Sequence, residues 1–138
     1  MTGEHMQIGE VVARTQLSQR TIRHYDEVGL VVPSARSQGG FRLYTESDVA
    51  RLMVIRRMKP LGFTLDEMRE LLAATDRLDS DEPIEDSEHR SLITTLRGFE
   101  HAAQQRCNEL RTQLERAEEF AGTLRQRLSA AQTGPARA

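Results

Sequence analysis

The chain has 138 residues, 38% of them hydrophobic, with no tryptophan and a single cysteine. This length fits one small domain, or one domain with an extension. No stretch approaches the roughly 18 consecutive apolar residues of a membrane span, and the start lacks the apolar core of a signal peptide. One cysteine cannot build an intramolecular disulfide framework or, alone, a thiolate metal cage. The composition therefore predicts a cytoplasmic protein with no metal site and no membrane partner.

The net charge of −2 hides an uneven distribution along the chain. Residues 1–62 carry nine bases and six acids, whereas residues 63–138 carry ten bases and fifteen acids. The front part is basic and the rear part acidic. This asymmetry favours two different partners, a polyanion for the front part and a protein for the rear part.

Two short helices are predicted near the start of the chain. Apolar residues at one-turn spacing indicate a first helix over residues 8–14. Ser18 is a favoured N-cap and Gly29 is typical of a helix end, so residues 18–28 are predicted to form a second helix. Two short helices joined by a tight turn favour a helix-turn-helix.

A hairpin is predicted next, because β-prone runs at residues 30–33 and 39–44 enclose the polar segment 34–38. Gly39 and Gly40 allow the positive φ of a tight turn. We expect Arg36, Arg42 and Tyr44 to project from the hairpin and to offer phosphate-binding donors beside the second helix.

Two further helices and an acidic stretch follow. A third helix is predicted from Thr45 until Pro60 and Gly62 end it. Thr64 and Glu67 have the spacing of a capping box and open a short fourth helix. Residues 76–88 hold seven acids and are interpreted as a linker, a solubilising tether in preference to a mimic of DNA.

A long helix is predicted over residues 89–132, and residues 133–138 are expected to form a disordered tail. Its apolar residues follow heptad spacing with one stutter, between Ala103 and Cys107. At roughly 65 Å the helix is too long for a small domain to cover, so the same helix of a second chain is the expected partner. The expected dimerisation seam consists of Leu92, Leu96, Phe99, Ala103, Cys107, Leu110, Leu114, Ala117, Ala121, Leu124 and Leu128. Cys107 is interpreted as a small hydrophobe in this seam, and a redox-sensing role is the alternative.

Four runs in order, at residues 8–11, 21–30, 40–44 and 61–67, resemble the MerR family of bacterial transcription regulators. The similarity extends in continuous register over residues 6–75. It implies a mainly α fold in which residues 1–75 form a winged helix-turn-helix DNA-binding domain. The long helix would then be the dimerisation helix, which forms an antiparallel coiled coil in that family.

The resemblance also implies where DNA would be contacted. Residues 18–25 would enter the major groove, with Arg20 reading a base edge through its planar fork. Other matching positions would hold phosphates and fix register without reading sequence. The candidate DNA-binding residues are Ser18, Gln19, Arg20, Thr21, Arg23, His24, Tyr25, Arg36, Arg42, Tyr44 and Lys59.

Members of the MerR family bind as homodimers to an inverted repeat in a promoter spacer that is too long for RNA polymerase, and they distort that DNA. The resemblance therefore implies a homodimer whose partners are double-stranded promoter DNA and RNA polymerase. It names no effector and no direction of regulation. The family's metal sensors use several cysteines, whereas this chain has one.

The sequence also bears on two other functional classes. An enzyme is disfavoured because the sequence has no nucleophile-and-base constellation and no glycine-rich phosphate loop, and no cofactor is expected. The second hypothesis is a protein-interaction or architectural module whose long helix captures a partner, with DNA binding secondary. Salt discriminates between them, because phosphate-driven binding weakens steeply with salt whereas seam packing barely responds.

Overall fold

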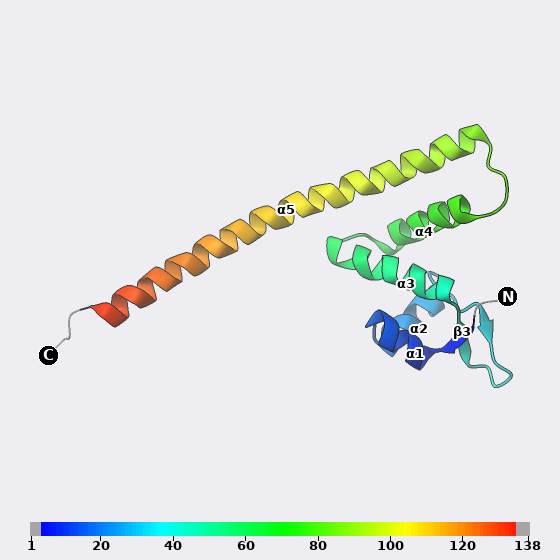
Figure 1. Cartoon of the computed structure of the whole chain (residues 1–138), viewed down its shortest axis with the longest axis horizontal. Helices are drawn as coiled ribbons and strands as arrows, with labels where there is room; N and C mark the ends of the chain where they lie inside the picture. The colour runs from blue at the N-terminus through cyan, green and yellow to red at the C-terminus, as the bar shows by residue number, and fades with distance from the viewer. Residues whose placement is uncertain (1–3, 135–138) are drawn as a thin grey trace. The chain divides into compact units, whose positions relative to one another are not determined.

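The computed structural model describes residues 4–134 as a mainly α fold (Figure 1). The elements in chain order are β1 (Met6–Gln7), α1 (Ile8–Thr15), α2 (Gln19–Glu27), β2 (Ala35–Arg36), β3 (Arg42–Tyr44), α3 (Glu46–Met58), the 3-10 turn η1 (Lys59–Leu61), α4 (Leu65–Asp79) and α5 (Asp86–Thr133). The chain divides into two compact units within α5, after Leu96. We call residues 4–79 the head and residues 35–44 the wing. No helix among residues 4–134 is both long enough and apolar enough to cross a membrane.

The helix-turn-helix predicted from the sequence is formed by α1 and α2. The Ser18 hydroxyl caps α2 by accepting from the Thr21 amide at 3.0 Å, and this satisfies one of the free amides of the first turn. Val11 from α1 and Ile22 from α2 are fully buried. The buried Thr15 hydroxyl donates to the Val11 carbonyl at 2.8 Å and so closes the end of α1. The turn is thus held by side chains as well as by the backbone.

The wing differs from the predicted hairpin. The antiparallel sheet has the order β1-β3-β2, with Ala35 opposite Leu43 in β3. Strand β1 was not predicted, because a two-residue strand has too little pattern to detect. The predicted strand at residues 30–33 is wrong: the amides of Leu30 and Val31 both donate to the Tyr25 carbonyl, at 2.9 and 3.2 Å. The buried side chains of Leu30 and Val31 close the end of α2 instead.

Capping boxes open both α3 and α4. In α3 the Thr45 hydroxyl accepts from the Asp48 amide, and the Asp48 carboxylate accepts from the Thr45 amide at 3.0 Å. That carboxylate, although buried, also accepts from the amide and the hydroxyl of Ser34. Asp48 therefore ties the start of the wing to α3. The apolar side chains buried in these helices are Val49, Leu52, Ile55, Met58, Met68, Leu72 and Ala74.

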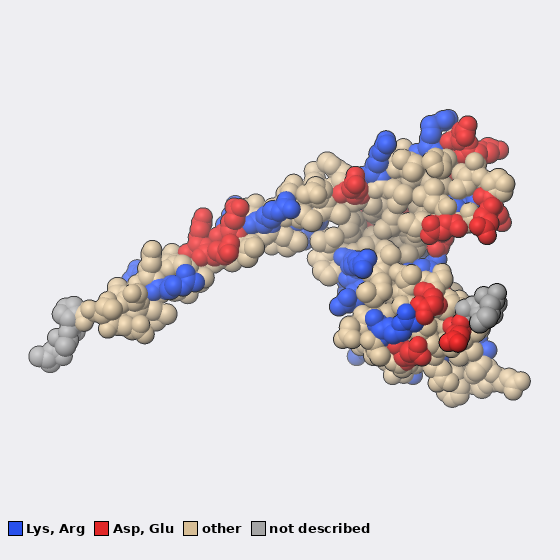
Figure 2. Space-filling view, viewed as in Figure 1, with Lys and Arg blue, Asp and Glu red and all other residues tan. Residues whose placement is uncertain are grey.

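The predicted linker over residues 76–88 is too long, because the segment between α4 and α5 covers only residues 80–85. The acids at its edges lie in helices and have partners. Asp76 pairs with Arg51 of α3, and Glu88 accepts twice from Arg77, at 3.0 and 3.1 Å. Arg77 also donates to the Pro83 carbonyl at 3.1 Å. Figure 2 shows acidic side chains gathered around this connection.

Helix α5 is 48 residues long, and none of them is buried. Its second half carries large apolar side chains that are exposed, namely Leu110, Leu114, Phe120, Leu124 and Leu128. Cys107 is partly exposed. The predicted tail begins at Thr133, which is the last residue of α5, and residues 135–138 lie outside the described residues.

Candidate nucleic-acid interface

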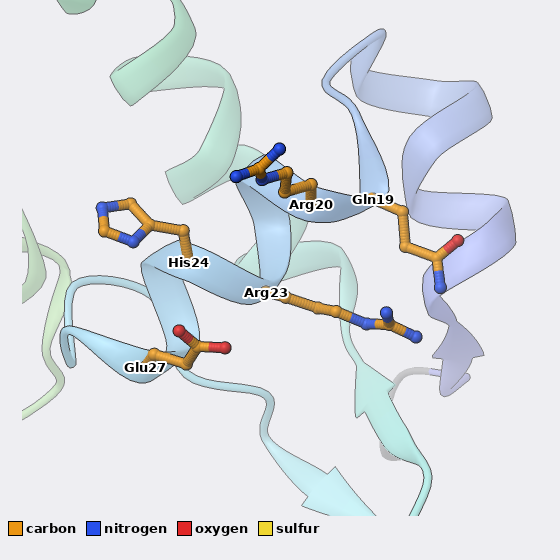
Figure 3. Close-up of a pocket in the computed structure, with 5 residues that line it drawn as sticks. All are labelled: Gln19, Arg20, Arg23, His24 and Glu27. Atoms are coloured by element: carbon orange, nitrogen blue, oxygen red, sulfur yellow. The ribbon is translucent and has the colours of Figure 1, made fainter.

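The exposed face of α2 is polar and basic. Ile22 and Tyr25 turn into the core, whereas Gln19, Arg20, Arg23, His24 and Glu27 are exposed. A shallow hollow of about 640 Å³ runs along it, lined by Gln19, Arg20, Arg23, His24 and Glu27. Figure 3 shows these side chains spread along α2, with the guanidinium groups extended away from the ribbon. Within residues 4–134, neither Arg20 nor Arg23 has an ion pair or a side-chain hydrogen bond. Both cations are therefore available to an external anion.

A second hollow, of about 240 Å³, lies beside the first. Its lining combines His24 and Tyr25 of α2 with Lys59 of η1, and with Phe63, Leu65 and Met68. Burial raises the pKa of Tyr25 above its ordinary value, so its phenol stays protonated. The structure thus brings three of the predicted residues, from two elements, to one hollow with a cation at its edge.

The wing arginines are held by one acid of α2. Arg42 Nε donates to Asp26 Oδ2 at 2.6 Å, and Arg36 Nη2 donates to the same oxygen at 3.1 Å. Arg36 Nη1 also donates to the Gly40 carbonyl in the turn, at 3.4 Å. The hydrogen bond to Asp26 raises the pKa of Arg42. The wing is therefore fixed to the helix that precedes it.

The prediction that Tyr44 projects from the hairpin is wrong. Tyr44 has no exposed surface, because it faces the core from β3, where it pairs with Met6 of β1. Its hydroxyl is buried and has no hydrogen-bond partner among residues 4–134. Burial raises the pKa of Tyr44, and the Asp26 carboxylate raises it further. Tyr44 is a core residue of the head and not part of the candidate interface.

The other predicted residues divide by their exposure. Ser18, Gln19, Arg20, Arg23, His24, Arg36 and Lys59 are exposed, whereas Thr21 and Arg42 are partly buried and Tyr25 is buried. Thr21 donates its amide to Ser18 and its hydroxyl accepts from the Ser18 hydroxyl, so it supports the cap of α2. Among these residues, only Tyr25 shares the burial of Tyr44.

Two features were missed by the sequence analysis. Phe41 lies at the tip of the wing and is 67% exposed. The tip is closed by hydrogen bonds of Ser37 with Phe41 and with Gly40, each at 2.9 Å between backbone atoms. The second feature is Asp26, which the sequence gives no reason to connect with arginines ten and sixteen residues further on. Of the two, only Phe41 could have been detected from neighbouring residues, because it follows Gly39 and Gly40 directly in the turn.

No group of three or more histidine, cysteine or acidic side chains within residues 4–134 is arranged to hold a metal ion. The chemistry that these surfaces offer is the donation of hydrogen bonds from cations. Arginine and lysine donors on an exposed helix beside a wing suit phosphate oxygens and base edges. The arrangement is that of a winged helix-turn-helix.

Comparison with known families agrees with this geometry. Residues 6–75 match the MerR HTH family regulatory proteins, and residues 49–130 match the family described as MerR, DNA binding. The chain belongs to the MerR family, and the resemblance seen in the sequence is confirmed.

Individual relatives extend the comparison. The chain is 46% identical over 66 residues to the HTH-type transcriptional regulator ZntR of Escherichia coli K12, which covers 48% of this chain and 47% of ZntR. It spans about half the length of the curated relatives that it matches.

Solved structures resemble the chain over more of its length. One is the transcription regulator PbrR691 of Ralstonia metallidurans in complex with lead(II), with 32% identity, a TM-score of 0.51, and coverage of 96% of this chain and 91% of that one. Another is HiNmlR, a MerR family regulator lacking the sensor domain and bound to promoter DNA. It has 19% identity, a TM-score of 0.71, and coverage of 95% and 96%. The latter likeness concerns the fold.

Proposed function

We propose that this protein is a transcription regulator that binds promoter DNA through α2 and the wing. The observation that carries the proposal is the pair Arg20 and Arg23, exposed on α2 without partners among residues 4–134. In this proposal Arg20 reads a base edge, and Arg23, Arg36, Arg42 and Lys59 bind phosphates. Family membership supports it. A protein that works on the chromosome is also cytoplasmic in a bacterium.

The proposed regulator is a homodimer, and the spacing of the seam supports an antiparallel arrangement. Four seam pairs are equidistant from Leu110 in the sequence: Leu92 and Leu128, Leu96 and Leu124, Phe99 and Ala121, and Ala103 and Ala117. Two antiparallel copies that cross at Leu110 therefore place apolar residues opposite each other in every one of these layers. The largest side chain of the set, Phe99, faces the small Ala121. Among the seam residues, only Cys107 and Leu114 are not equidistant from Leu110; their distances in the sequence differ by one residue, as a result of the stutter.

Two rigidly linked heads can do work on DNA that one head cannot. Bending or untwisting a site costs on the order of 1–10 kcal/mol, which must come from contacts made by both heads at once. We propose that the dimer binds an inverted repeat in an overlong promoter spacer, distorts it and thereby changes its use by RNA polymerase. An effector, where one exists, acts only through a difference in its affinity for two arrangements of the dimer.

Selection of genomic fragments by the purified protein at physiological salt, followed by sequencing, tests the DNA proposal. Enrichment of an inverted repeat within a promoter spacer is the expected outcome. Retention that is sensitive to salt but blind to sequence would contradict the regulator proposal and favour an architectural role. Binding that salt does not weaken would show that phosphates do not drive it.

Two substitutions separate the roles of α2 and the wing. Arg42→Ala is expected to weaken binding to all sequences alike, because a phosphate contact carries no sequence information. Arg20→Ala is expected to weaken binding to the selected repeat by about 10- to 100-fold and to relax base preference at one position of each half-site. Equal losses of specificity from both changes would contradict the assignment.

Disulfide cross-linking tests the antiparallel arrangement. In a Cys107→Ser background, Leu110→Cys is expected to cross-link two copies, because only residues at the crossing point meet their own counterpart. Leu124→Cys alone is expected to give no cross-link, whereas Leu96→Cys mixed with Leu124→Cys gives the heterodimer. Cross-links at both single positions would indicate parallel helices. A mass of 15.7 kDa at all concentrations would exclude the dimer itself.

A further inference from the structure

Asp26 is a carboxylate in a surface that otherwise gathers cations. It lies in the last turn of α2, and its side chain is only 11% exposed. Negative charge in the last turn of a helix is disfavoured by the helix dipole. A carboxylate beside DNA also repels phosphate. Neither the stability of α2 nor the charge of the interface therefore explains an acid at this position.

The hydrogen bonds of Asp26 supply a reason. One oxygen, Oδ2, accepts from Arg42 of β3 and from Arg36 of β2, at 2.6 and 3.1 Å. Both strands of the wing are thereby fixed to the helix that carries Arg20 and Arg23. Arg42 donates through Nε, and its two Nη groups have no hydrogen-bond partner among residues 4–134. Arg36 donates from one Nη to Asp26 and from the other to the Gly40 carbonyl, at 3.4 Å.

We propose that Asp26 is a positioning residue for DNA binding. It holds the wing at a fixed distance from α2 and orients Arg42 so that its Nη fork is presented to a phosphate. The proposal rests on the DNA binding proposed above. Orientation in advance matters because an unrestrained arginine loses rotamer freedom when it binds, and Asp26 removes that freedom before DNA arrives.

The neighbouring residue offers a matched control. Glu27 also lies in the last turn of α2, has an exposed side chain and lines the hollow with Arg20 and Arg23. Within residues 4–134 it has no hydrogen bond or ion pair. Asp26→Asn and Glu27→Gln remove the same charge from the same helix end. If charge alone matters, both substitutions tighten DNA binding, since each removes a repulsion from phosphate.

The experiment measures the dissociation constant for the selected repeat at several salt concentrations. Asp26→Asn is expected to weaken binding by about tenfold, as loss of a charge-assisted contact does. Glu27→Gln is expected to tighten binding, because it removes a repulsion from phosphate. In a background with both Arg36→Ala and Arg42→Ala, Asp26→Asn is expected to have no further weakening effect, because Asp26 acts through these two arginines.

The outcomes separate this proposal from the DNA-binding proposal. If the unaltered protein does not bind the repeat, DNA binding itself fails. If it binds and Asp26→Asn tightens binding as Glu27→Gln does, or weakens it equally without the arginines, the positioning role is wrong. Near-ultraviolet circular dichroism of the two tyrosines checks that the head is folded. If Asp26→Asn does not fold, Arg42→Lys replaces it as the test, because it keeps the positive charge but loses the guanidinium fork. A severalfold weakening of DNA binding is then expected. An unchanged dissociation constant would overturn the proposal.

Discussion

The head and α5 are stabilised in opposite ways. The head buries side chains from all four of its α-helices, and Ile22, Leu52, Ile55 and Tyr44 have essentially no exposed surface. Helix α5 is more than three times as long as α3 and buries none of its 48 residues. A helix acquires most of its stability from packing of its apolar face. The head therefore carries its stabilising contacts within itself, whereas the second half of α5 is expected to gain them from the second copy in the proposed dimer.

The largest expected effect comes from Leu52→Ala in the core of the head. Removing a fully buried leucine side chain costs about 2–5 kcal/mol of unfolding free energy, because a cavity remains. The chain has two tyrosines, Tyr25 and Tyr44, and both are buried in the head. Unfolding in urea, followed by their near-ultraviolet signal, is expected to shift equally at every protein concentration. A shift below about 1 kcal/mol would mean that the head is not packed as described.

The same substitution in α5 is expected to behave differently. Leu124 is 48% exposed in the single chain, so Leu124→Ala removes few contacts within that chain. If two copies pair along the seam, the far-ultraviolet transition, to which α5 contributes most, moves to lower urea as the protein is diluted, and Leu124→Ala lowers it further at each concentration. The tyrosine signal should hardly move. A far-ultraviolet transition that does not depend on concentration would show that the helix gains its stability from its own chain.

The contrast between the regions also explains what the sequence could reveal. Helix caps are local, since the hydroxyl and the amide that it binds lie three residues apart, and the caps at Ser18 and Thr64 were predicted from the sequence. The start of α3 at Thr45 was predicted as well, without its capping box. The long helix was equally plain, because heptad spacing is a property of one segment. Membership of the MerR family followed from four short runs in order.

Interactions between distant residues explain the errors. Leu30 and Val31 have a β-prone sequence, but the free carbonyl of Tyr25 and the core decide their conformation. The linker was predicted too long because the acids at its two edges are held by distant partners: Arg51 of α3 pairs with Asp76, and Arg77 of α4 pairs with Glu88. Tyr44 was expected outside because the register that turns it inward depends on β1. The contacts of Asp26 with the wing were not predicted, because its partners Arg36 and Arg42 lie ten and sixteen residues further along the chain.

A smaller effect is expected from removing a helix cap in the head. Thr45→Ala deletes the hydroxyl that caps α3 and leaves the Asp48 amide without its acceptor. The loss is expected to be about 1 kcal/mol in the tyrosine transition. Thr112→Ala is the control in α5, where the hydroxyl only returns a hydrogen bond to the Asn108 carbonyl within the helix. An equal loss from the control would mean that the cap contributes nothing particular.

The smallest effect distinguishes the two regions by pH. Burial raises the pKa of Tyr44 and of Tyr25 above 10.0, so their phenols stay protonated in the folded head while those of the unfolded chain ionise. The stability that they contribute is complete below pH 10 and is lost as the pH rises from there through the folded pKa values. In urea unfolding measured at alkaline pH, the head should therefore lose stability before α5 does. Tyr44→Phe is expected to reduce this loss, and at pH 7 to leave the head as stable or up to about 1 kcal/mol more stable, because its buried hydroxyl has no partner among residues 4–134. A loss of stability at pH 7 would show that the Tyr44 hydroxyl has a hydrogen-bond partner. An unchanged dependence of the unfolding free energy on pH above 10 would show that Tyr44 does not cause the alkaline loss.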